Sequence, residues 1–241
     1  MSGLRRILII VSAFAVAMGF LESAVVVYIR EIYYPGGFDF PMVTPEGTIA
    51  VTEILREAAT MVMLLTAGIL AGRNAPERFA WFLYSFAVWD IFYYVFLKLL
   101  VGWPASLLTW DVLFLIPVTW VGPVIAPVLV SLTMILLALL ILHFSYRSLD
   151  ARISAVQWIL LVAGSFVLIL SFTWDYSGFV LEHLSFSEIW TVPGEQLAIT
   201  ISGYIPRKFN WFLFCLGEGI ILAGILLFWQ KHGAHGRATA D

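Results

Sequence analysis

The chain has 241 residues, of which 61% are hydrophobic and only 12% are charged, against roughly a quarter charged in an ordinary soluble domain. A soluble core of this size could not bury so much apolar surface, so the composition excludes a soluble globular domain. The net charge is −3, and the sequence has no basic patch and no run of like charges. A nucleic-acid-binding protein, which needs a positively charged surface, is therefore excluded.

Apolar runs recur along the whole chain, and a run of about 20 residues is long enough to cross a hydrocarbon layer about 30 Å thick. The first run follows Arg5 and Arg6 and continues to about residue 29, which favours an uncleaved span over a signal peptide. Cys215 is the only cysteine, so an internal disulfide is excluded. We predict a single all-α domain over residues 1–241, a polytopic transmembrane helical bundle of six spans. The spans are expected at about residues 7–29, 49–72, 79–100, 124–144, 156–173 and 209–229.

Residues 105–121, between the third and fourth spans, are apolar but short. Asp111 and Pro117 interrupt this segment, and Pro123 and Pro127 follow it. Proline removes a backbone donor and disrupts helices, so we predict a re-entrant or interfacial helical segment that does not cross. The alternative is a seventh span, which would place the C-terminus outside.

The positive-inside rule favours the six-span arrangement. If residues 105–121 do not cross, eight of the thirteen basic residues fall on the cytoplasmic side. We therefore predict a multi-pass protein of the inner or plasma membrane with both termini in the cytoplasm. Residues 174–208 then form an external loop with aromatic side chains suited to the headgroup region, and residues 230–241 form a polar cytoplasmic tail. The eight basic residues are Arg5, Arg6, Arg73, Arg78, Arg147, Arg152, Lys231 and Arg237.

Six acidic residues lie within the predicted spans or in the segment 105–121. An ionised carboxylate at this depth is costly unless a partner, a proton, a metal or water compensates it. On the six-span topology all six fall in the half of the membrane nearer the outside, and one shared carboxylate-rich site in the outer leaflet would account for that bias. The six are Glu22, Glu53, Glu57, Asp90, Asp111 and Glu218.

Helical spacing places further candidate residues beside these acids. Residues three or four apart share a helix face, so Arg56 can pair with Glu53. Asp90 shares its face with two tyrosines that could form a pocket wall. The candidate neighbours of the acids are Arg56 and Lys98 as counter-charges and Tyr93 and Tyr94 as wall.

A structural interpretation of the same residues is also open. Glu53, Arg56 and Glu57 could form an ion pair and cap at the membrane interface. Asp111 could cap a short interfacial helix, and Asp90 could form a polar network with Lys98 that only holds the bundle together.

His183 is the only histidine in the predicted outer loop. It could complete a divalent-metal site with Glu22, Glu57 and Asp90, whose oxygens suit such ions. The sequence has no ExxH pair, HExxH, GxSxG, Walker loop or dinucleotide-binding glycine fingerprint, and it indicates no particular cofactor.

Three functions remain open. The first is a protein that binds or transports a cation, a proton or a small substrate at the carboxylate-rich site. The second is a membrane-embedded enzyme acting on a lipid or isoprenoid, with two carboxylates as acid and base. The third is a structural or assembly subunit of a membrane complex. The expected partners are the lipid bilayer, a cation or lipid-like ligand and other membrane subunits, and not nucleic acid.

Overall fold

A computed structural model of the chain describes residues 2–43, 47–115, 118–147, 151–185, 187–188 and 202–238. The structure is 77% helical. Within the described residues, six helices are long and apolar enough to cross a membrane, as the sequence predicts, and each is longer than the predicted span. They are α1 (Ser2–Tyr33), α2 (Gly47–Ala71), α3 (Ala75–Val101), α4 (Ile125–Arg147), α5 (Ala155–His183) and α7 (Trp211–Ala238).

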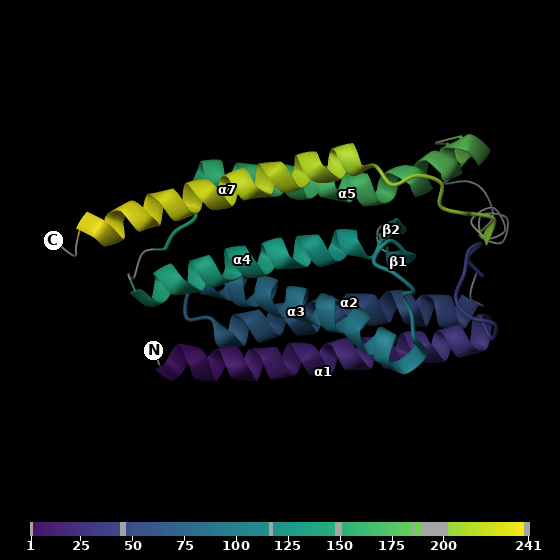
Figure 1. Cartoon of the computed structure of the whole chain (residues 1–241), viewed down its shortest axis with the longest axis horizontal. Coiled ribbons are helices and arrows are strands. Elements are labelled where there is room, and N and C mark those ends of the chain that lie inside the picture. The colour runs from purple at the N-terminus through teal and green to yellow at the C-terminus, as the bar shows by residue number, and fades with distance from the viewer. Residues whose placement is uncertain are drawn as a thin grey trace.

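The helices lie lengthwise beside one another (Figure 1). Helix α3 packs against α1, α2 and α4, and α5 packs against α7. Helix α4 lies between these two groups and contacts α7. The two ends of the chain lie at the same end of the bundle (Figure 1), as an even number of spans requires. The side of the membrane on which they lie, and the single domain over residues 1–241, stay predictions.

Local signals in the sequence explain where the helices begin and end. The Asn74 side chain accepts a hydrogen bond of 3.0 Å from the backbone N–H of Glu77 and caps the start of α3. Gly102 follows the end of α3 with φ of 70°, a left-handed conformation that glycine adopts without strain. Ser154 and Gln157 form a capping box at the start of α5.

Large apolar side chains cover the outer faces of the helices. Leu70 is 87% exposed, Phe212 is 76% exposed and Leu99 is 73% exposed. A soluble protein rarely exposes apolar surface on this scale, whereas lipid tails accept it. Together with the six apolar helices, this pattern indicates a multi-pass membrane protein.

The described residues of the segment 105–121 do not form the helical segment that the sequence predicts. Strands β1 (Trp110–Phe114) and β2 (Trp120–Pro123) instead pair antiparallel, with Asp111 opposite Gly122. Aromatic and β-branched residues favour a pleated, half-buried strand, and the prolines oppose a helix. The segment nevertheless does not cross as a helix, so the six-span arrangement stands. Pro117 lies outside the described residues.

The predicted outer loop is shorter than expected because α5 continues to His183. Residues 174–183 are therefore helical, not part of a loop. Asp175 on this extension accepts hydrogen bonds from the Tyr204 hydroxyl at 2.8 Å and from the backbone N–H of Arg207 at 3.0 Å and Lys208 at 3.1 Å. These bonds attach the segment before α7 to α5. Residues 189–201 lie outside the described residues.

Candidate functional site

A cavity of about 400 Å³ lies between α1, α2 and α3. It is at the end of the bundle that carries the hairpin of β1 and β2, which we call the hairpin end. Residues of β1 and the residue after it line one side, and Tyr176 of α5 contributes from another. Most of the lining surface is apolar. A cavity of this size falls at the smaller end of ligand-binding pockets, which span about 300–1,000 Å³.

Helical periodicity carries the polar side chains into this cavity. On α1, Glu22, Val26, Arg30 and Tyr33 follow one another at intervals of three or four residues, and all four line it. On α2, Glu53 and Glu57 are four residues apart. On α3, Tyr93 and Tyr94 follow Asp90 by three and four residues, and all of these side chains line the cavity. Residues at such intervals share one helix face, so each helix contributes one polar stripe.

The first polar group in the cavity is centred on Arg56 of α2. Its Nη1 pairs with Glu22 of α1 and its Nη2 with Glu53 of its own helix. Its Nε donates a further hydrogen bond of 2.8 Å to Glu53. This arrangement confirms the predicted pairing of Arg56 with Glu53 and shows that Arg56 also ties α1 to α2.

Glu57 and Asp90 are held by neutral groups. Glu57 accepts a hydrogen bond of 3.1 Å from the backbone N–H of Leu115, just after β1. Asp90 accepts one of 2.8 Å from the Ser131 hydroxyl on α4. Within the described residues, neither carboxylate has an ion-pair partner within 4.0 Å.

A further polar contact in the cavity, between Arg30 and Asp111, joins the hairpin to α1. Arg30 Nη2 lies 3.4 Å from Asp111 Oδ1, and the guanidinium stacks on the rings of Phe38 at 4.4 Å and Trp103 at 3.9 Å. Asp111 is 1% exposed. Burial raises the pKa of Asp111 to about 6, although the Arg30 guanidinium acts in the opposite direction.

Three buried polar atoms of cavity-lining residues have no hydrogen-bond partner within the described part of the chain. They are Asp111 Oδ2, Arg30 Nη1 and Trp89 Nε1. A buried polar atom without a partner is costly, so the cavity offers hydrogen-bonding capacity that a ligand or water can use.

The described lining residues carry an excess of negative charge. Five carboxylates face two guanidiniums, which leaves an excess of three negative charges when all are ionised. The carboxylates are Glu22, Glu53, Glu57, Asp90 and Asp111, and the guanidiniums are Arg30 and Arg56.

Two residues of the predicted carboxylate site, Glu218 and Lys98, do not line the cavity. Glu218 of α7 accepts a hydrogen bond of 2.9 Å from Thr133 of α4 and does not line the cavity. Lys98 donates to the carbonyl oxygens of Gly102 at 2.9 Å and Pro104 at 2.8 Å. Lys98 therefore closes the C-terminal end of α3 and is not the counter-charge of the cavity acids.

His183 does not join the carboxylates in the structure. Its Nδ1 lies 2.9 Å from the carbonyl oxygen of Phe179, one turn earlier in α5, and His183 does not line the cavity. Among the described residues, no group of three or more His, Cys, Asp or Glu side chains is arranged to hold a metal ion. The structure thus offers no support for the metal site of His183 with Glu22, Glu57 and Asp90.

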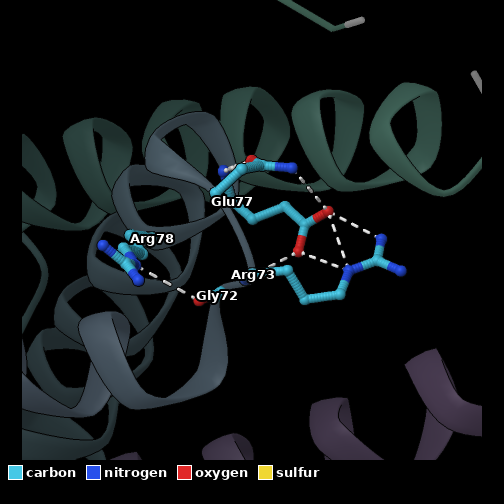
Figure 2. Close-up of polar contacts among 5 residues, drawn as sticks. Gly72, Arg73, Glu77 and Arg78 are labelled. Carbon is cyan, nitrogen blue, oxygen red and sulfur yellow. Dashed lines mark hydrogen bonds and ion pairs between the residues drawn. The ribbon is translucent and has the colours of Figure 1, made fainter. Parts of the chain in front are cut away.

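A separate polar cluster occupies the turn between α2 and α3, at the end of the bundle where the chain termini lie. Figure 2 shows the Glu77 carboxylate facing the Arg73 side chain, with a hydrogen bond of 2.7 Å from Nη2 and one of 3.0 Å from Nε. Arg78 Nε donates to the carbonyl oxygen of Gly72 at 3.3 Å. Glu77 is fully buried. The hydrogen bonds of this cluster close the turn, and the Arg73 guanidinium stacks on the ring of Tyr146 of α4 at 4.1 Å. We therefore assign the cluster a structural role.

Arg30, Trp89 and Ser131 are not among the residues that the sequence predicts for the site. A signal for Arg30 was present, because it lies eight residues after Glu22 and so returns to the same helix face. Ser131 gave no such signal, since it lies on another helix whose packing against α3 is a tertiary feature.

Comparison with protein-family models, with curated proteins and with solved structures gave no match for this chain. The assignment of a function therefore depends on the chemistry of the cavity alone.

Proposed function

We propose that this membrane protein binds a small cationic ligand in the cavity between α1, α2 and α3. The observation that carries the proposal is the excess of carboxylates over guanidiniums among the lining residues. Charges of one sign in a low-dielectric cleft raise the local concentration of ligands of the opposite sign. The same binding step would serve transport of the cation.

Glu57 and Asp90 are the acids available to such a ligand. Arg56 and Arg30 already pair with Glu22, Glu53 and Asp111, whereas the bonds from Leu115 and Ser131 leave the charge of the other two uncompensated. A bound cation would compensate it and offset the cost of holding carboxylates away from water.

The test measures thermal unfolding of the purified protein, reconstituted in phosphatidylcholine nanodiscs, against a panel of inorganic and organic cations. A ligand at ten times its Kd adds about 1.4 kcal/mol of stability, which raises the unfolding temperature of a chain of this size by about 3–6 °C. We expect at least one cation to produce this shift in the wild-type protein. Glu57→Gln and Asp90→Asn should remove most of it.

Glu218→Gln is the matched control, since Glu218 is also a helix carboxylate but does not line the cavity. It should leave the shift unchanged. If no cation stabilises the wild-type protein, or if Glu218→Gln abolishes the shift as fully as Glu57→Gln does, the proposed function is wrong.

The second candidate is an enzyme acting on a lipid or isoprenoid, and the mostly apolar lining of the cavity favours it. Asp90 and Asp111 would then serve as acid and base beside Tyr93 and Tyr94. This candidate requires turnover. If the protein is such an enzyme, the wild-type protein converts a bound lipid to product, and Asp90→Asn should abolish this conversion but not lipid binding. If the protein only binds its ligand, the wild-type protein forms no product either.

A further inference from the structure

The size and lining of the cavity distinguish between kinds of cation. A calcium ion takes six to eight oxygen ligands at about 2.3–2.6 Å. A calcium site therefore needs several oxygen atoms that point to one position, and a wide cavity does not provide this. The described residues contain no arrangement of three or more acidic, histidine or cysteine side chains that could hold a metal. A cavity of about 400 Å³ with a mostly apolar lining is also far larger than a dehydrated metal ion.

The apolar lining would stabilise a hydrocarbon body. Burial of apolar surface contributes about 25 cal/mol for each Å² removed from water. Several lining residues are aromatic, among them Tyr34, Phe38, Trp89 and Tyr93. Aromatic faces attract organic ammonium groups through cation–π interactions, in addition to their apolar contact.

A buried, unpartnered acceptor marks a place for a hydrogen-bond donor. Asp111 Oδ2 has no partner within hydrogen-bond distance among the described residues, although the hydroxyls of Tyr93 and Tyr94 of α3 face the carboxylate. Asp111 is 1% exposed and lines the cavity. An ammonium group carries N–H donors. It can therefore satisfy this oxygen and compensate the charge of Glu57 or Asp90, which a purely apolar ligand cannot do.

From these features we infer that the ligand is a hydrophobic amine: an organic ammonium ion whose charged end meets the carboxylates and whose apolar body fills the rest of the cavity. This inference rests on the proposed function and narrows it to one class of cation. The ammonium group meets Asp111 Oδ2 together with Glu57 or Asp90, and the aromatic and aliphatic lining contacts the body.

The experiment compares 4-phenylbutylamine, the uncharged 4-phenylbutan-1-ol, sodium and calcium as ligands. Binding to the full chain in phosphatidylcholine nanodiscs is measured by calorimetry at pH 7, with empty nanodiscs subtracted to remove partitioning into lipid. We expect 4-phenylbutylamine to bind at least tenfold more tightly than the alcohol. Glu57→Gln or Asp90→Asn should weaken amine binding about tenfold or more, as expected for loss of a charge-assisted hydrogen bond, and Glu218→Gln should not.

Each other outcome has a defined meaning. If sodium or calcium binds in a Glu57-dependent way and the amine does not, the proposed cation site stands but the amine inference is wrong. If the alcohol binds as tightly as the amine, the charge is irrelevant and the amine inference is wrong. If none of the four ligands binds to the correctly folded protein, the amine inference is wrong, and the proposed function then stands or falls with the panel of cations described above. Asp111→Asn provides a second variant where Glu57→Gln or Asp90→Asn does not fold.

Discussion

Asp111 is a buried carboxylate whose charge couples the hairpin to α1. Burial raises its pKa to about 6 despite the opposing effect of Arg30. The groups that face it are Arg30 from α1 and, from α3, the hydroxyls of Tyr93 and Tyr94 and the carboxyl group of Asp90. Because Asp111 ionises near neutrality, the ion pair with Arg30 weakens as the pH falls below about 6.

The raised pKa predicts the pH dependence of stability. A carboxyl group whose pKa is higher in the folded than in the unfolded state stabilises the fold most when protonated, and this contribution is lost as the pH rises through the folded pKa. A change from 3.8 to about 6 corresponds to roughly 3 kcal/mol. Relative to the Asp111→Asn variant, the wild-type protein should therefore lose stability between about pH 4 and pH 6.

Thermal unfolding of both proteins across this pH range measures the effect. The asparagine variant leaves Arg30 without its partner at every pH, which lowers its stability by a constant amount. The test is therefore how the stability difference between the two proteins changes with pH, and not how large that difference is. A difference that stays constant from pH 4 to pH 7 would contradict the raised pKa.

At the scale of the helices, glycines set how closely the bundle packs. A Cβ atom on Gly68 of α2 would lie 2.8 Å from the carbonyl oxygen of Arg78 and 2.8 Å from the backbone nitrogen of Phe82 on α3. Both are backbone atoms of a packed helix and cannot rotate away. The spacing Gly68-x-x-x-Gly72 is typical of close contacts between membrane helices.

Gly68→Ala should therefore force α2 and α3 apart and destabilise the protein by about 1–3 kcal/mol, the usual range for overpacking. Gly178→Ala on α5 is the matched control, because a Cβ there would meet nothing within 4 Å. It should be neutral or slightly stabilising, since alanine favours helix more than glycine does. Unfolding temperatures in detergent test the pair, and equal values for the two variants would refute the close contact.

At the scale of the whole molecule, basic residues gather at one end of the bundle. The N-terminus of α1, the turn between α2 and α3, the end of α4 and the end of α7 lie at the end opposite the hairpin (Figure 1), and these segments contain Arg5, Arg73, Arg147 and Lys231. The positive-inside rule predicts that this end faces the cytoplasm, and the cavity would then lie at the outer end.

Cysteine labelling tests this orientation in intact cells, in a Cys215→Ser background. Single cysteines at Asp39 and Gly203, exposed near the hairpin end, should react with an impermeant thiol reagent. Single cysteines at Ala75 and Arg152, exposed at the other end, should react only after the membrane is opened. Labelling of Ala75→Cys from outside would reverse the predicted orientation, and labelling of all four would show that the reagent had entered.

The sequence by itself determined the six spans and the helix faces. Each span depends on a local property, an apolar run long enough to cross the bilayer, and each polar stripe depends on spacing along one helix. From their depth on the predicted topology, the sequence grouped six acids at one site, and five of them line the cavity: Glu22, Glu53, Glu57, Asp90 and Asp111. The interruption of residues 105–121 was also visible in the prolines.

Only the tertiary structure decided how these stripes combine. Glu218 has the same local setting as Asp90, an acid within an apolar helix, yet α7 packs against α4 and α5 and so carries it away from the cavity. The sequence already placed Asp111 in the site, but its pairing with Arg30 depends on the pairing of β1 with β2. Contacts of this kind join residues 81 positions apart, and no periodicity within one segment encodes them.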